Sequence, residues 1–161
     1  MKLAHHEIFA MLSRLLVAYT YDFDAALVTE LGPGSGPPPS LAMWANVLQF
    51  VSDDGLPMKE LPPRCGIAKA TVKSMVSCLK RHGWVAVDAG GIIRLTARGL
   101  EAKRAFPKAK AAVERQWAAR WGRQTVDALR SALEDASERV DGRFPQYPMP
   151  APHRGALPTG E

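Results

Sequence analysis

Residues 66–84, GIAKATVKSMVSCLKRHGW, constrain the fold of this chain more than any other stretch. Apolar residues recur there at spacings of three and four, which predicts a helix from about residue 68 to 82 with one buried face. The buried set is Val72, Met75, Val76 and Leu79. Gly66 predicts a turn before this helix, and Gly83 predicts a cap after it. The open face is rich in lysines and small hydroxyls, so it is free to meet solvent or a partner.

The segments around this helix complete a recognisable order. KELPPRC, residues 59–65, predicts a short helix whose prolines fit its first turn, because the first four N–H groups of a helix have no partner within it. WVAVD and IIRLT alternate around AGG, which predicts a two-stranded hairpin. LAMWANVLQFV, residues 41–51, is expected to be one short core helix. Helix, turn, helix and hairpin predict a winged helix-turn-helix domain over residues 41–100.

Long helices are expected on both sides of this domain. Residues 1–31 predict an N-terminal helix whose apolar stripe is wider than one face. The glycine and proline run that follows ends it. Residues 101–140 continue a helix that begins near Ala97, kink at Pro107, and end in a last helix with an apolar seam typical of a coiled coil. The tail at 141–161 holds five prolines and is expected to be extended or disordered.

The two flanking helical segments predict a homodimer. Each fully buried Val or Leu stabilises by about 1.5–3 kcal/mol, so four such residues in each chain suffice to hold two copies together. The alternative is that both segments pack within one chain. The candidate dimer contacts are Ile8, Leu12, Leu15, Val126, Leu129, Leu133 and Val140. The expected fold is mainly α with a small β-hairpin wing, and its N- and C-terminal helices serve dimerisation.

Charge is distributed unevenly along the chain. Residues 1–58 hold 2 basic and 6 acidic groups, whereas residues 59–104 hold 10 basic and 3 acidic groups, a net charge of +7. Such an asymmetry indicates a polyanionic partner for the middle segment, although a solvated basic surface gives the same count. Double-stranded DNA is the partner that fits a basic helix next to a wing, because the major groove admits one α-helix and shows distinguishable base edges.

The residues near the start of the helix at 68–82 are the ones expected to reach bases. The base-reading candidates are Lys69, Thr71, Lys73 and Ser74. Residues farther along this helix and on its neighbours are better placed for phosphates, which position a protein without reading sequence. The phosphate candidates are Arg64, Ser77, Lys80, Arg81 and Arg94.

The run from Leu56 to Leu100 resembles the MarR family of winged-helix regulators. The residues that carry this resemblance are KELPPRCGIAKATVKSMVSCLKRHGWV and IIRLTARG, in which leucine and threonine lead into a helix start with glycine. The resemblance implies a homodimeric transcriptional repressor that binds an inverted repeat. Two departures stand out: the wing tip, Asp88 to Gly91, lacks the family's arginine, and LPPR replaces an alanine-rich stretch. The wing is therefore expected to read DNA weakly.

The resemblance also implies a pocket for a small aromatic effector. Trp117 and Trp121, one helical turn apart, are the better pair of tryptophans for such a contact, but the effector-binding residues stay open. Cys65 and Cys78 are expected to be reduced thiols that pack as small hydrophobes, with a redox switch as the alternative.

Several function classes find no support in the sequence. It contains no catalytic motif, no metal-ligand spacing among its four histidines and no cofactor fingerprint, so we expect neither an enzyme nor a metal or cofactor. No apolar run approaches the roughly 20 residues that span a bilayer, and no signal pattern is present, so a cytoplasmic protein without membrane contact is expected. The alternative function is a winged-helix module that binds other proteins without specific DNA binding.

Overall fold

The computed structural model of this chain describes residues 7–34 and 36–139. The expectations for residues 1–6, for Val140 and for the tail at 141–161 lie outside this range. The described residues divide into two compact units. The helical unit contains the chain up to residue 41 together with residues 101–138, and the winged-helix unit contains residues 42–100.

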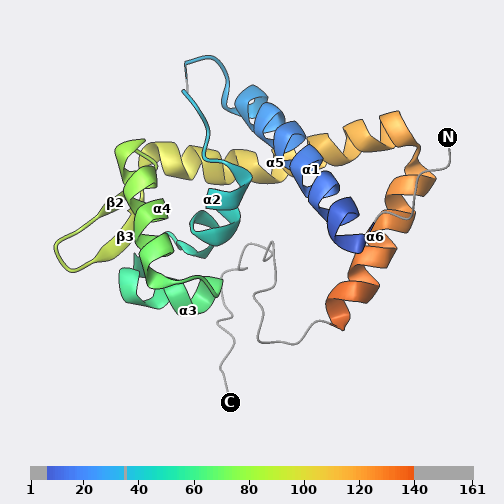
Figure 1. Ribbon diagram of the computed structural model, residues 1–161. Helices are drawn as coiled ribbons and strands as arrows, with labels where there is room; N and C mark the ends of the chain where they lie inside the picture. The colour runs from blue at the N-terminus through green and yellow to red at the C-terminus, as the bar shows by residue number, and fades with distance from the viewer. Residues whose placement is uncertain (1–6, 35, 140–161) are drawn as a thin grey trace. The chain divides into compact units, whose positions relative to one another are not determined.

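The helical unit is built from long helices, which are α1 (Ile8–Leu31), α5 (Ala97–Trp121, of which residues from 101 belong here) and α6 (Arg123–Glu138). In Figure 1, α1 crosses α5. The two helices meet through aromatic rings. Phe23 lies edge-on to Phe106 with ring centroids 4.9 Å apart, and Tyr19 lies edge-on to Trp117 with ring centroids 5.5 Å apart. Edge-to-face pairs of this kind add about 0.5–1.5 kcal/mol beyond the area they bury.

Proline and glycine act differently in this unit. α5 runs through Pro107 without ending, so the helix is continuous there, and the expected kink stays a prediction. Gly122 has φ +89° and separates α5 from α6, as expected for a glycine at a helix end. Arg130 of α6 then reaches Glu114 of α5 at 3.0 Å, so the two helices are joined across the turn.

The winged-helix unit carries the expected order of elements with additional short ones. They are α2 (Leu41–Asn46), the 3₁₀ helix η1 (Leu48–Phe50), β1 (Leu56–Pro57), the 3₁₀ helix η2 (Met58–Glu60), α3 (Leu61–Cys65), α4 (Lys69–Arg81), β2 (Val85–Val87) and β3 (Ile92–Leu95). Its fully buried side chains include Trp84, Leu61, Leu79 and Ile93. The mainly α fold with a small β wing is thereby confirmed.

The wing has three strands rather than the two expected from sequence. The antiparallel order is β1-β3-β2, with Leu56 opposite Ile93 and Val85 opposite Leu95. β1 is two residues long and ends in Pro57, so it offers no alternating pattern for detection. A proline is tolerated there because β1 is an edge strand, where one N–H is not needed for the ladder.

The single helix expected at 41–51 is also wrong. α2 ends at Asn46, and Val47 adopts φ −134° and ψ −63° before η1 begins. Val47 and Leu48 are both fully buried, so the break turns two successive apolar side chains into the core. Burial explains the mostly apolar sequence, which looks the same whether the helix is continuous or broken.

Candidate nucleic-acid interface

α4 presents its basic face as the sequence predicts. Gly66 has φ +65° and ends α3 in the left-handed conformation, and α4 starts three residues later. Val72, Val76 and Leu79 are buried beneath α4, with Met75 half-buried beside them. The four base-reading candidates, Lys69, Thr71, Lys73 and Ser74, are all exposed on the first two turns of the helix.

The phosphate candidates divide into free and engaged side chains. Ser77, Lys80 and Arg81 are exposed on α4. Arg64 of α3 forms an ion pair with Glu60 at 2.8 Å, with both side chains 41% exposed. Exposed pairs one turn apart contribute only about 0.3–0.5 kcal/mol, so Arg64 can leave Glu60 for a phosphate at small cost.

Arg94, which lies on β3 of the wing, makes two polar contacts that the sequence does not indicate. Its guanidinium donates to the backbone carbonyl of Asp54 and lies 3.9 Å from the Asp88 carboxylate. Asp88 in turn accepts a hydrogen bond from the Ile92 N–H at 2.9 Å. Arg94 therefore fastens the wing to the turn before β1, and only the half of its side chain that stays exposed faces outward.

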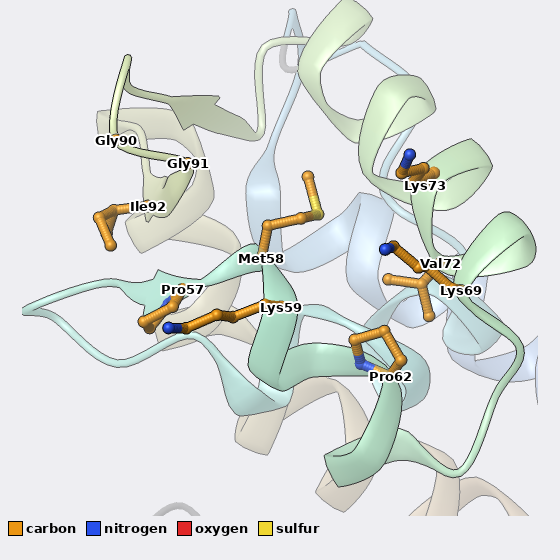
Figure 2. Close-up of a pocket in the computed structure, with 10 residues that line it drawn as sticks. All are labelled: Pro57, Met58, Lys59, Pro62, Lys69, Val72, Lys73, Gly90, Gly91 and Ile92. Carbon is orange, nitrogen blue, oxygen red and sulfur yellow. The ribbon is translucent and has the colours of Figure 1, made fainter.

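Lys59 belongs to the same face and was missed by the sequence-based assignment. It lines an open groove of about 390 Å³ that lies between α4, the start of α3 and the wing tip. Figure 2 shows Lys69 and Lys73 projecting from α4 on one side and Lys59 on the other. Lys59 lies within the basic segment, so charge counting included it, but its position ten residues before α4 gave no sign of this proximity.

The predicted dimer residues differ in exposure within the chain. Ile8, Leu12 and Leu133 are 72%, 49% and 46% exposed, whereas Leu15 and Leu129 are half-buried. Val126 is already buried in its own chain, beside α5 residues such as Ala118. Further large apolar side chains on α1 are also exposed: Phe9, Met11, Leu16, Val17, Tyr21 and Val28.

The two tryptophans considered for effector contact, Trp117 and Trp121, pack against each other with ring centroids 4.2 Å apart. Trp117 is 6% exposed, and its indole N–H donates to the Asp22 carboxylate at 2.7 Å. Burial, together with the nearby Glu114 charge, raises the pKa of Tyr19 to about 12. Trp117 thus has a structural role at the crossing of α1 and α5.

The remaining candidate chemistry is sparse. Cys65 is buried and Cys78 half-buried, and they form no disulfide bond within the described residues. Among the described residues, no group of three or more histidine, cysteine or carboxylate side chains is arranged to hold a metal ion. No helix within the described ranges has the length and apolarity needed to span a membrane.

No family model matches the sequence, and no curated protein matches it. Solved structures do. The MarR family protein Rv2887 of Mycobacterium tuberculosis is 26% identical, with 85% of this chain and 99% of that one covered and a TM-score of 0.56. A MarR family transcriptional regulator from Silicibacter pomeroyi is 25% identical, with 81% and 91% covered and a TM-score of 0.52.

Two further structures bear on ligands of similar proteins. Rv2887 has also been solved in complex with DNA, at 26% identity over 81% of this chain and 98% of that one, with a TM-score of 0.54. CouR of Rhodococcus jostii has been solved bound to p-coumaroyl-CoA, at 19% identity over 91% and 99%, with a TM-score of 0.57. Fold, element order and these similarities agree, and the chain is a MarR-like winged helix-turn-helix protein.

Proposed function

We propose that this protein is a sequence-specific, double-stranded-DNA-binding transcriptional repressor. The observation that carries the proposal is the exposed basic face of α4 beside a small wing. The similarity to a protein solved in complex with DNA supports it. Val72, Val76 and Leu79 bury the opposite face of α4 in the core, and this burial holds the polar face outward.

The polar side chains of α4 and its neighbours have two roles in this proposal. Base edges in the major groove are read by Lys69, Thr71, Lys73 and Ser74. A lysine ammonium donates to guanine, and a hydroxyl can donate to or accept from a base. Phosphates are bound by Arg64, Ser77, Lys80, Arg81 and the exposed part of Arg94. The wing contributes little to reading, because its tip carries no basic side chain and Arg94 is held by Asp54 and Asp88.

The protein acts as a homodimer in this proposal. The exposed apolar side chains of α1 and Leu133 of α6 give two copies a surface to bury, and a monomer leaves that surface in water. A twofold dimer places its two recognition helices about one DNA turn apart, roughly 34 Å, so the operator is an inverted repeat.

A small aromatic effector releases the protein from DNA in this proposal. CouR, a transcriptional repressor, is bound to p-coumaroyl-CoA in one solved structure, and PcaV of Streptomyces coelicolor has been solved with its natural ligand. Both proteins share the fold of this chain at 18–20% identity, so their ligands indicate only that the fold accommodates such regulation.

A selection from random duplexes tests the proposal. The full-length protein is incubated with a random pool, and bound DNA is amplified, sequenced and re-measured by fluorescence anisotropy beside a scrambled duplex. We expect an inverted repeat to be enriched. With about 6–10 phosphate contacts, its affinity falls by roughly 10³–10⁵ between 50 and 200 mM salt. Absence of binding at 50 mM salt would instead favour a winged-helix module that binds other proteins.

A further inference from the structure

The C-terminal end of α4 is joined to the start of α5 within the winged-helix unit. Gly83 has φ +74°, and its N–H donates to the Lys80 carbonyl at 3.0 Å. The Trp84 N–H donates to the Leu79 carbonyl at 2.9 Å, so the last turn of α4 is closed as glycine-capped helices are. The two carbonyls that follow this turn, those of His82 and Gly83, accept hydrogen bonds from side chains at the beginning of α5.

Thr96 and Arg98 supply those side chains. The Thr96 hydroxyl donates to the Gly83 carbonyl at 2.6 Å, and the Arg98 guanidinium donates to the His82 carbonyl at 2.6 Å. The same guanidinium lies over the Trp84 ring, 3.9 Å from its centroid, and Trp84 is buried in the core. A cation is favourable at this end of a helix, because the carbonyl groups there carry partial negative charge. Arg98 therefore holds the last turn of α4 against a fixed point of the core.

The direction of α4 depends on both of its ends. The N-terminal end follows the turn at Gly66, and Lys69 and Lys73 lie on the first two turns. The helix has 13 residues and is roughly 20 Å long, so a tilt of about 10° around its middle moves each end by about 1.7 Å. Hydrogen bonds keep their strength over only a few tenths of an ångström. Loosening the C-terminal end of α4 would therefore disturb base contacts made near its N-terminal end.

We propose that Arg98 is a positioning residue for the DNA specificity of this protein. Arg98 reads no base, because its guanidinium is engaged by the Trp84 ring and the His82 carbonyl. It acts by fixing the direction in which α4 presents its base-reading side chains. The effect on specificity rests on the proposed function, whereas the hold of Arg98 on the end of α4 does not.

The DNA preference of Arg98→Gln tests the effect on specificity. Anisotropy measures the affinities for the duplex selected from the random pool and for a scrambled duplex, each at two salt concentrations. The preference for the selected duplex should fall at least about fivefold, which is the discrimination that one base contact contributes. The affinity for the scrambled duplex and its salt dependence should stay unchanged. Arg98→Lys keeps a cation beside Trp84 and should recover most of the preference. The matched control is Arg104→Gln, which removes the same charge from an exposed position on α5 and should keep the wild-type preference.

Hydrogen exchange measured by NMR tests the hold on α4 without DNA. In Arg98→Gln the amides of Gly83 and Trp84 should exchange about tenfold faster than in the wild type, because the hydrogen bond from a charged donor is lost at this turn. The Val76 amide, in the middle of α4, should keep its wild-type rate. All variants are compared at a temperature at which circular dichroism shows them folded.

Several results would overturn the inference. Equal losses of affinity for both duplexes, with a salt slope lower by about 1, would make Arg98 a phosphate contact. An unchanged preference in Arg98→Gln would leave it only a structural role, and an equal loss in Arg104→Gln would reduce the effect to general charge. Exchange rates that change equally at Gly83, Trp84 and Val76, or not at all, would show that Arg98 does not hold the end of α4. A wild type that prefers neither duplex would refute the proposed function and the effect on specificity with it, while hydrogen exchange would still decide whether Arg98 holds α4.

Discussion

At the scale of single residues, Gly99 shows how closely the start of α5 approaches the wing. A Cβ atom at this position would lie 2.1 Å from the Trp84 carbonyl oxygen. Thr96 reinforces the junction, because its hydroxyl accepts from the Gly99 N–H at 3.1 Å and caps α5. The Arg98 guanidinium stacks over the Trp84 ring at 3.9 Å. Only a residue without a side chain fits between these groups.

Gly99→Ala should therefore destabilise the protein. Either the backbone at Trp84 or that of α5 has to move, and overpacking of this kind costs about 1–3 kcal/mol. The control is Gly90→Ala at the wing tip, where the nearest atom is an Asp88 carboxylate oxygen at 3.3 Å that needs to shift by only a few tenths of an ångström. Denaturant unfolding measures both variants. Equal stabilities for the two would show that the approach at Gly99 is not rigid.

Tyr19 predicts an alkaline limit to stability. Its folded-state pKa of about 12 exceeds the ordinary value of 10.0, because burial and the Glu114 charge disfavour the phenolate. The neutral phenol therefore stabilises the fold below pH 10, and this contribution is lost as pH rises from 10 to 12. Tyr19→Phe should show a shallower loss of melting temperature over that window. In absorbance titration at 295 nm the late-ionising step should vanish in Tyr19→Phe but persist in Tyr21→Phe, whose side chain is exposed.

At the scale of elements, periodicity in the sequence was sufficient where one face of an element is buried. α4 was predicted within a residue at each end, because its buried and exposed residues alternate with helical period. The break at Val47 was missed because LAMWANVLQFV is apolar at most positions, so its pattern does not distinguish a continuous helix from a broken one. β1 was missed because two residues carry no period, and Lys59 was missed because the sequence alone does not show that it lines the same groove as Lys69.

The exposed side chains of α1 and α6 lead to a prediction about assembly. Leu12→Asp and Leu133→Asp should each shift the protein from dimer to monomer, because burial of a leucine stabilises by about 1.5–3 kcal/mol and a buried unpaired carboxylate costs more. Analytical ultracentrifugation measures the shift, with circular dichroism as the check on folding. Ala128→Asp is the control, since it places the same charge on α6 away from the Val126–Leu133 seam. A dimer that survives both leucine changes would show that these helices serve only one chain.

At the scale of the whole molecule, positive charge is concentrated on the elements that form the candidate nucleic-acid interface. The net +7 of residues 59–104 falls mainly on α3, α4 and β3, and the described residues of α1 carry more acidic than basic groups. The positions of charged residues along the sequence predict this asymmetry, but they do not predict which side chains lie together in the folded protein. Which lysines share one groove depends on the turn at Gly66 and on the pairing of β1 with β3.

The most direct test of the account is the DNA specificity of a Lys69→Ala/Lys73→Ala double variant. Its affinity for the selected duplex and for a scrambled one is measured by anisotropy beside Lys108→Ala/Arg115→Ala, which removes two exposed charges from α5. If Lys69 and Lys73 read bases, the double variant should lose its preference for the selected duplex by at least about tenfold, because each good base contact contributes about 1–3 kcal/mol of discrimination. The α5 variant should keep that preference. An unchanged preference in the Lys69→Ala/Lys73→Ala variant would contradict the assignment of α4 as the reading helix.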